Sequence, residues 1–423
     1  MLKRKGHWGN LTACRLQRGN MISVQDARDT INAELFQPNR IYIELQRSQN
    51  YFLAEDICAD RDYPPFNRAA VDGYAFRYAD IEAGKKSFSV AATIFSGEGF
   101  LEKVNEGTCI KIMTGAAVPP GFDVLLKVEH CKESGGLVSI PEETLASGLN
   151  ISQRGENVRQ GEVIIKKGTK IDERVVHSLA AAGVIQPPVF SLPVVNIVST
   201  GNEIIRVNEQ PNEYQIRDSN YYGLLFHLAK LNIFPKMYAI IKDDEKEINT
   251  GLTEALDCDV LLISGGVSMG DRDFVPAILL ELGAKNLFHK VNIKPGKPFW
   301  FGHFTRKNSN RKTFIFALPG NPFSTLVAYK VFIEPWLYGS FCNAGQRSYY
   351  MPLEREKILK GDRPEYFPAA ISTKPGSAST LDALAFHGSG DVTATAGSDG
   401  LGFHPIEKRR LEKGDIVEFI PWN

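Results

Sequence analysis

Residues suited to binding anions and cations follow apolar, strand-like segments in the second half of this chain. They are Glu203 after VVNIVS, Asp243 after MYAIIK, Gly265, Gly266, Ser268 and Asp273 after DVLLIS, Lys294 and Lys297 after FHKVNI, and Pro319 and Pro322 after TFIFAL. Glycine turns at the start of a helix expose backbone N–H groups that can hold a phosphate. Carboxylates supply the oxygen ligands that hard divalent cations prefer.

Each of these turns also has an ordinary structural interpretation. The Gly265-Gly266 turn can be a tight strand-to-helix connection, and the KPGK turn can lie on the surface without a function. The prolines of LPGNP fix φ and remove a donor, so they can stiffen a pocket wall or end a strand. Together, five such turns on one sheet edge favour a site for a phosphorylated ligand and a divalent cation.

The elements that would position these turns alternate in type from Val194 onward. Short apolar segments typical of buried strands are followed by amphipathic segments such as SNYYGLLFHLAKL, which Asp218 or Ser219 could cap. This alternation predicts βαβ units and a doubly wound α/β sheet. In such a sheet, ligands bind at the carboxyl ends of the strands, which is where the turns would lie.

Two further candidates lie in an earlier region of short apolar stretches and glycine-rich turns, which is typical of a small β domain. Asp72 stands in the stretch PPFNRAAVDGYA, and Thr114 follows a predicted strand in IMTGA. Asp72 could be a catalytic carboxylate, or it could cap a local turn, and the residues alone favour neither.

Composition excludes several function classes. Lys plus Arg equals Asp plus Glu at 49 each, so no global charge points to nucleic acid or an anionic membrane. No apolar run is long enough to span a membrane. The six cysteines show no CxxC pairs, which predicts reduced thiols and a cytoplasmic protein rather than a disulfide framework or a zinc site. The first twenty residues are basic and lack the apolar core of a secretory signal, and translation is expected to start at Met21 or to leave a basic extension.

The chain is long enough for several domains. The changing pattern of apolar stretches, turns and amphipathic segments along the sequence predicts a multi-domain α/β plus β protein. Its parts would be a doubly wound α/β domain, an inserted small β domain, an elongated linking domain and a C-terminal barrel-like β domain. The predicted bounds are 21–62 with 151–190 for the linking domain, 63–150 for the inserted domain, 191–340 for the α/β domain and 341–423 for the C-terminal domain.

Taken together, the motifs resemble one family, the MoeA proteins, which are similar to the E domain of gephyrin and of its plant counterpart. The matching stretches, in chain order, are PPFNRAAVDGYAF, GTCIKIMTGAAVP, QRGENVRQGE, STGNEI, QIRDSN, IIKDD, ISGGVSMGDRDF, KVNIKPGKPFWFG, LPGNPFS and HGSGDVTATAGSDGL. The resemblance covers essentially the whole chain from Met21 to the C-terminus.

The resemblance implies a molybdopterin molybdenumtransferase that works as an elongated, four-domain homodimer. Its active site would lie between the α/β domain of one subunit and the β domain of the other. The implied reaction takes molybdate and adenylylated molybdopterin and yields molybdenum cofactor and AMP, with Mg2+ as the cation. Transient contact with the molybdopterin adenylyltransferase and with apo-molybdoenzymes is also expected, without nucleic acid or membrane partners.

Site residues carry over from the family by motif. Those implied to act in the reaction are Asp72, Thr114, Glu203, Asp243 and Asp273, the last three also as positions for the cation. Those implied to bind the cofactor are Gly265, Gly266, Ser268, Lys290, Lys294, Lys297, Pro319, Pro322 and Ser389. Lysines and backbone amides would neutralise the phosphates and the molybdate dianion.

The chain departs from the family pattern at a few positions. Asn67, Ala69 and Val71 stand where an Asp, a Ser and a Met are usual, and Asn157 stands where an Asp is common. The two lost charges could change metal affinity, or they could be neutral if those acids are structural.

Two other functions remain open at this point. Related α/β modules adenylylate molybdopterin or act as pyrophosphatases, although such stand-alone modules lack the VDGYA and late GSG elements. A non-enzymatic scaffold is the other alternative, and this chain lacks the appended second α/β module and long linker that a gephyrin-like scaffold carries.

Overall fold

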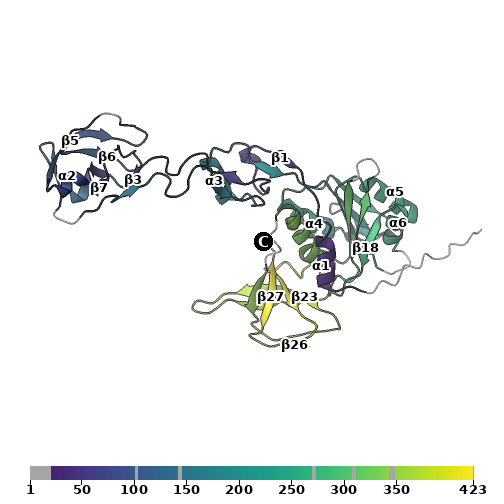
Figure 1. Ribbon diagram of the computed structural model, residues 1–423. Coiled ribbons are helices and arrows are strands. Elements are labelled where there is room, and N and C mark those ends of the chain that lie inside the picture. Colours follow the sequence, from purple (N-terminus) through teal and green to yellow (C-terminus); the bar gives the residue numbers. More distant parts are fainter. Residues whose placement is uncertain are drawn as a thin grey trace, which may run out of the picture. The chain divides into compact units, whose positions relative to one another are not determined.

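The computed structural model describes residues 21–100, 103–141, 145–268, 273–306, 311–342 and 348–422. The basic segment before Met21, which includes Cys14, and residues 269–272 of the GGVSMGDRD turn lie outside these ranges. The chain divides into two compact units (Figure 1), the first comprising Met1–Ile41, Asn50–Phe52 and Phe190–Asn423 and the second Tyr42–Gln49 and Leu53–Val189. Within the described ranges, every helix is too short or too polar to cross a membrane.

The first unit is built on a six-stranded sheet with the strand order β16-β13-β17-β20-β19-β18. Its first four strands are parallel, whereas β19 runs antiparallel to both of its neighbours, so β18 points in the same direction as β20. The strands are β13 (Val195–Thr200), β16 (Met237–Ile241), β17 (Val260–Ser264), β18 (Lys285–His289), β19 (Trp300–Thr305) and β20 (Lys312–Leu318). The predicted doubly wound α/β sheet is confirmed, and β18 ends earlier than expected, at His289.

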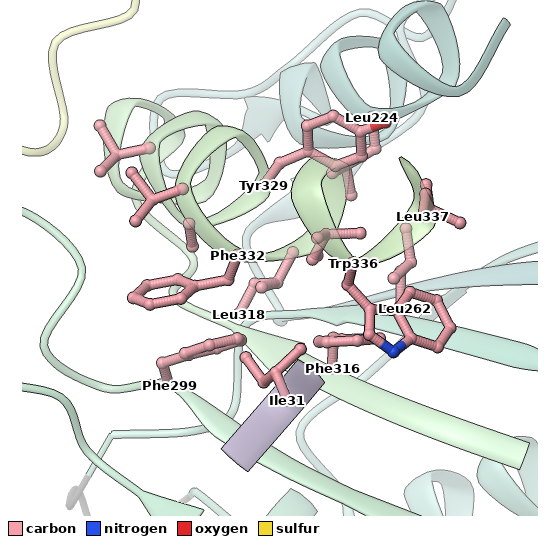
Figure 2. Close-up of a cluster of buried hydrophobic side chains, with 14 of the residues drawn as sticks. Ile31, Leu224, Leu262, Phe299, Phe316, Leu318, Tyr329, Phe332, Trp336 and Leu337 are labelled. Atoms are coloured by element: carbon pink, nitrogen blue, oxygen red, sulfur yellow. The ribbon is translucent and has the colours of Figure 1, made fainter. Parts of the chain in front are cut away.

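Helices cover both faces of this sheet, because its central strands are apolar on both sides. On one face, Val195 and Ile197 of β13 belong to the same core as residues of α1 (Val24–Asn32), α4 (Ser219–Ala229), α7 (Pro322–Ala328) and α8 (Glu334–Phe341). Figure 2 shows part of this core, in which Trp336 and Phe332 lie against Phe316 and Phe299. On the other face, Val198 packs with residues of α5 (Glu245–Ala255) and α6 (Val275–Glu281).

Polar side chains fix where the helices begin. The side chain of Asp218 accepts a hydrogen bond from the backbone N–H of Tyr221 and caps α4, and Asp244 caps α5 in the same way. The helical stretch from Pro322 to Phe341 is not uniform, because residues Tyr329–Ile333 form a π-helical segment between α7 and α8. The wider turn precedes Pro335, whose missing N–H could not complete an α-helical ladder.

The C-terminal part of the first unit is a five-stranded antiparallel sheet with the order β21-β27-β25-β23-β24. It has its own apolar core, which includes Phe367, Leu381 and Phe419. The strands are β21 (Tyr349–Pro352), β23 (Glu365–Ser372), β24 (Thr380–Ala383), β25 (Gly400–His404) and β27 (Ile416–Pro421), with the small pair β22 (Lys357–Ile358) and β26 (Arg410–Leu411). Another short pair, β14 (Ile204–Ile205) and β15 (Ile216–Arg217), lies before α4.

The second unit contains a six-stranded sheet with the order β7-β4-β6-β5-β9-β8, as expected for the small β region. Its two faces carry separate cores, one around Ile110 and Ile112 and the other around Phe76 and Phe88. The strands are β4 (Gly73–Phe76), β5 (Ser87–Ile94), β6 (Thr108–Ile112), β7 (Val124–Lys127), β8 (Lys132–Ser134) and β9 (Leu137–Ser139).

The remaining elements of the second unit are short. They are β2 (Ile57–Cys58) paired with β11 (Val163–Ile165), β3 (Arg68–Ala69) paired with β10 (Ile151–Ser152), α2 (Tyr78–Glu82), α3 (Glu173–Ala181), and the 3-10 turns η1 (Leu45–Arg47) and η2 (Val128–His130). The side chain of Asp172 caps α3 by accepting hydrogen bonds from the backbone N–H groups of Arg174 and Val175. Strands β1 (Arg40–Tyr42) and β12 (Pro188–Phe190) lie where the chain passes between the units. The exact bounds of a four-domain division stay a prediction.

Candidate active site

A cavity of about 670 Å³ lies at the carboxyl ends of the parallel strands of the first unit. This is the edge at which an α/β sheet binds its ligands. Eight of the residues predicted from the sequence line it, namely Glu203, Asp243, Gly265, Gly266, Ser268, Asp273, Pro319 and Pro322. The structure thus brings the turns after four different strands together around one space.

The Gly-Gly turn after β17 lies so close to its neighbours that a side chain has no room there. A Cβ atom on Gly265 would lie 2.5 Å from the backbone oxygen of Thr200, and one on Gly266 would lie 2.8 Å from the hydroxyl oxygen of Thr200. Both glycines have positive φ angles, 97° and 65°, which other residues rarely adopt. The glycines therefore allow the ends of β13 and β17 to meet at the floor of the cavity.

Two residues that line the same cavity carry a buried hydroxyl oxygen without a hydrogen-bond partner among the described residues. They are Ser199 and Thr200 at the end of β13, whose exposed fractions are 2% and 5%. A buried polar atom without a partner costs free energy, so such atoms in a native protein call for a physical reason. Ser199 and Thr200 therefore make the end of β13 a polar part of the cavity wall.

The start of helix α4 forms a further part of the wall and was not singled out residue by residue from the sequence. Asn220 is buried, and its amide nitrogen donates to the hydroxyl of Ser264 at 2.8 Å and to the backbone oxygen of Gly320 at 2.7 Å. Asn220 therefore ties the helix to the glycine turn after β17 and to the LPGNP turn after β20. The signal for it was the QIRDSN stretch, which matched the family pattern but carried no assigned role.

The three carboxylates predicted to position a cation all reach this cavity. Glu203 is exposed, whereas Asp243 and Asp273 are half-buried. Within the described ranges, no three His, Cys, Asp or Glu side chains are close enough to form a ready-made metal site. The donor set still fits a hard cation such as Mg2+, which binds through one or two carboxylates, water and substrate phosphates rather than in an all-protein cage.

The predicted lysines lie on the loop that follows β18, and none of the three is among the described residues that line the cavity. Lys297 is exposed, and Lys290 is half-buried with a positive φ of 81°, which is rare outside glycine. Lys294 instead forms an ion pair with Glu365, with 2.9 Å between its ammonium nitrogen and a carboxylate oxygen. Pro298 of this loop does line the cavity.

Ser389 connects the C-terminal part of the first unit to the cavity wall. Its backbone oxygen accepts a hydrogen bond from the N–H of Phe323 in the first turn of α7, and its hydroxyl oxygen accepts one from the amide of Asn321 at 2.8 Å. The neighbouring Gly390 and Val392 line the cavity. The predicted residue thus lies beside the cavity, on a loop whose other residues form part of its wall.

Asp72 and Thr114 belong to the second unit, where the sheet brings them into direct contact. Asp72 precedes β4 and Thr114 follows β6, and the antiparallel register pairs Gly73 with Ile112. The carboxylate of Asp72 accepts hydrogen bonds from the backbone N–H and the hydroxyl of Thr114, at 2.7 and 2.8 Å. These bonds lower the pKa of Asp72 below its ordinary value, since they stabilise the charged form. The carboxylate therefore caps a turn and is ionised at neutral pH.

Two of the departures from the family pattern can be located. The side-chain oxygen of Asn67 accepts a hydrogen bond from the backbone N–H of Arg154 at 3.0 Å. An amide oxygen makes this contact as a carboxylate would, so the missing charge at Asn67 leaves the local structure intact. Asn157 takes part through its backbone, donating to the backbone oxygen of Tyr63.

Sequence comparison shows that three family profiles match successive parts of the chain. These are the MoeA N-terminal region (domain I and II) over residues 22–183, a probable molybdopterin binding domain over 196–339 and the MoeA C-terminal region (domain IV) over 350–422. The molybdopterin molybdenumtransferase of Bacillus subtilis is 31% identical over 96% of this chain and 95% of its own length. That of Haemophilus influenzae is 32% identical over 74% of this chain and 76% of its own.

A solved structure shows the same fold over nearly the whole chain. The molybdopterin biosynthesis MoeA protein of Pyrococcus horikoshii superposes with a TM-score of 0.80 and 27% identity, covering 95% of this chain and 100% of that one. Matches that include the N-terminal and C-terminal regions distinguish this chain from a stand-alone α/β module. The chain therefore belongs to the MoeA family, the molybdopterin molybdenumtransferases of molybdenum cofactor biosynthesis.

Proposed function

We propose that this protein inserts molybdate into adenylylated molybdopterin in an Mg2+-dependent reaction that releases AMP. The observation that carries the proposal is the cavity at the carboxyl edge, where glycine-turn amides, two unpartnered buried hydroxyls and three carboxylates meet in a chain of this family. Donors and carboxylates around one cavity suit a ligand with phosphates and a bound cation.

The donor groups would hold the anionic parts of the substrates. The N–H of Gly265 is taken by the backbone oxygen of Leu318, at 3.1 Å, which fixes the turn. The backbone N–H of Gly266 and the hydroxyls of Ser199 and Thr200 are held by the fold before any ligand arrives, so little reorganisation is needed on binding. Lys290 and Lys297 add positive charge on the loop after β18. Charge-assisted hydrogen bonds of this kind are shorter and stronger than neutral ones.

Glu203, Asp243 and Asp273 would hold the Mg2+ ion. When bound, such an ion neutralises phosphate charge and polarises the pyrophosphate for cleavage. The residues' own contribution is to fix the position of the negative charge at the cavity wall. Asp243 is aligned for this by its backbone N–H, which donates to the side-chain oxygen of Asn202 at 3.2 Å.

Asp72 and Thr114 would orient molybdate, or would accept hydrogen bonds from it once the molybdate is protonated. Because Thr114 lowers the pKa of Asp72, the carboxylate has no proton to donate at neutral pH, which argues against a general-acid role. Replacing Asp72 by Asn should reduce molybdenum insertion by at least about 100-fold, in the range of losing one preorganised hydrogen-bonding group of an active site, while AMP binding is unchanged. Full activity of that variant in a single-turnover assay would remove Asp72 from the mechanism.

The test of the proposed function is AMP release by the purified protein incubated with adenylylated molybdopterin, molybdate and Mg2+. We expect AMP release to require both molybdate and Mg2+, and the product to activate an apo-molybdoenzyme. AMP release without molybdate would indicate a pyrophosphatase instead, and no AMP release under any condition would refute the proposal.

We further propose a cytoplasmic homodimer that exchanges substrate and product with the molybdopterin adenylyltransferase and with apo-molybdoenzymes. The five cysteines that the structure describes are free, which suits a reducing compartment. The dimer rests on the family resemblance, and light scattering on the purified protein would measure it directly. A monomer at micromolar concentration that is fully active would contradict it.

A further inference from the structure

A buried carboxylate joins two lysines at the point where the loop after β18 meets the C-terminal sheet. Glu365 at the start of β23 is only 3% exposed. Its two oxygens lie 2.9 Å from the ammonium of Lys294 and 3.0 Å from that of Lys357. The ammonium of Lys294 also donates to the backbone oxygen of Lys360 at 2.6 Å. Two of the three N–H donors of Lys294 are thus engaged by the C-terminal part of the chain.

Backbone hydrogen bonds also join Lys294 to the start of β23. The N–H of Lys294 donates to the oxygen of Pro364 at 2.9 Å, and the N–H of Tyr366 donates to the oxygen of Lys294 at 2.7 Å, so Lys294 pairs with Glu365 as an isolated parallel bridge. The KPGK turn is therefore attached to β23 by side chain and backbone together. Four residues further on, Pro298 lines the cavity.

Lys357 connects Glu365 to two aromatic rings, one of which packs against α7. Its ammonium lies 4.6 Å from the ring centre of Phe367 and 5.9 Å from that of Phe386, within reach of a cation–π attraction. Phe386 packs edge-on against Phe323 of α7, with ring centres 5.2 Å apart. Phe386 also begins the loop that carries Ser389 and Gly390 to the cavity.

From these contacts we infer that Glu365 is a positioning residue, and that Lys294 serves the site through Glu365 rather than by touching the substrate. The group Lys294, Glu365 and Lys357, here named the buried latch, aligns the KPGK loop and the Ser389 loop without itself lining the cavity. This inference rests on the proposed function for its effect on the reaction, but the latch itself can be measured without any activity.

Loss of the Glu365 charge should release Lys294 and leave Lys357 without compensation. Removing one partner of a buried ion pair is costly because the remaining charge stays buried, and the side chain of Lys357 is only 14% exposed. Lys294, with 33% of its side chain exposed, can turn to solvent instead. The KPGK loop would then keep only its backbone attachment to β23.

The first arm of the experiment measures the acetylation rate of individual lysines in the folded full-length protein by mass spectrometry. In E365Q we expect Lys294 to react at least about five-fold faster than in the wild type, while Lys297 is unchanged. If E365Q does not fold, E365D keeps the charge on a shorter side chain and should still raise the rate at Lys294. An unchanged rate at Lys294 in a folded variant would overturn the latch.

The second arm is a double-mutant cycle on KM and kcat for AMP release with K294M, E365Q and both changes together. If Lys294 acts through Glu365, each change raises KM by about ten-fold, kcat changes little, and the double variant is no worse than the single ones. If Lys294 binds substrate directly, the effects multiply to about 100-fold and the inference is wrong.

The matched control is E354Q, which removes another carboxylate of the C-terminal part of the chain. Glu354 is not part of the latch and pairs instead with Lys374, with 2.9 Å between the ammonium nitrogen and a carboxylate oxygen. This variant should change neither the labelling of Lys294 nor KM, and a shift equal to that of E365Q would contradict a specific role for Glu365. A wild type that releases no AMP would refute the proposed function, whereas the labelling arm would still decide the latch.

Discussion

Two cavities of about 670 Å³ lie at opposite edges of the six-stranded sheet of the first unit. One is at the carboxyl ends of the strands, and the other is at the amino ends, beside Val194, Asp259 and Lys312, which stand before or at the start of β13, β17 and β20. Since their volumes are equal, size does not distinguish them. The two cavities differ in the groups that line them.

The residues lining the cavity at the carboxyl edge include two with buried polar atoms that lack a partner and two glycines that let β13 and β17 meet at its floor. At the amino edge, Glu34 pairs with Lys312, and Asp259 pairs with Arg306 at 2.6 Å. None of the buried polar atoms that lack a partner, among the residues the structure describes, belongs to a residue lining the amino-edge cavity. The residues lining the first cavity therefore include buried polar atoms that could take a ligand as partner, whereas no such atom is found among the described residues that line the second.

The largest effect is expected from a methyl group at the floor of the carboxyl-edge cavity. Gly265→Ala would place a Cβ 2.5 Å from the backbone oxygen of Thr200 at a φ of 97°. Overpacking and backbone strain together should cost roughly 3 kcal/mol of unfolding free energy, and AMP release should fall by at least about 100-fold because the floor no longer closes. Denaturant unfolding and single-turnover kinetics measure the two effects.

Gly283→Ala is the matched control for this change. Gly283 has a nearly equal φ of 94°, but a Cβ there would meet nothing within 4 Å. The control should cost only about 1 kcal/mol and leave AMP release unchanged. Equal losses of activity in the two variants would mean that strain alone, not the cavity floor, causes the effect.

Because the hydroxyl of Thr200 has no partner among the described residues, its removal should weaken ligand binding without lowering the unfolding free energy. Thr200→Val removes a buried polar atom without a partner, so the unfolding free energy should stay the same or rise slightly, while the Kd for AMP rises about ten-fold. Thr313→Val at the amino end of β20 should do the reverse. Its hydroxyl is bonded to the backbone oxygens of Leu256 and Cys258, and its loss should cost roughly 1 to 3 kcal/mol without affecting AMP binding.

Isothermal titration calorimetry and thermal unfolding on both variants check this pair. A Thr200→Val protein that is destabilised as much as Thr313→Val would show that the hydroxyl of Thr200 already has a partner in the ligand-free protein. The contrast between the two edges would then lose its physical basis.

The smallest effect concerns the loop beside the cavity wall. Hydrogen bonds from the backbone of His387 and from Thr393 lower the pKa of Asp391 from 3.8 to about 2. Because the folded-state pKa is depressed, the stabilisation is present above pH 3.8 and is lost as the pH falls through about 2. The difference in melting temperature between wild type and Asp391→Asn should therefore shrink over this window. A constant difference down to pH 2 would contradict the assignment.

Much of the fold could be predicted because local pattern and tertiary structure agree. Alternation of apolar segments with amphipathic ones marked the α/β sheet, and Asp218, one of two candidate caps, marked the start of α4. The antiparallel direction of β19 could not be predicted in this way, since the length of a connection does not determine whether the strands it joins run parallel or antiparallel. The π-helical segment before Pro335 was also missed, because a proline in a long apolar helix predicts an interruption but not its form.

The candidate site was predictable where its residues sit in turns directly after strands, since those turns share one sheet edge. It was not predictable where side-chain contacts decide the role. Lys294 looked like a phosphate ligand from its turn, yet Glu365, 71 positions later in the sequence, holds its ammonium. Ser199 and Thr200 lie inside an apolar strand, and only burial without a partner identifies them.

The most direct test of the central claim compares one carboxylate at each edge. Single-turnover AMP release from adenylylated molybdopterin, with molybdate and titrated Mg2+, would be measured for Glu203→Gln at the carboxyl edge and Glu34→Gln at the amino edge. We expect Glu203→Gln to lower the rate by about 100-fold and to raise the Mg2+ requirement, whereas Glu34→Gln should stay within about two-fold of the wild type. Equal losses in both variants, or a loss only in Glu34→Gln, would contradict it.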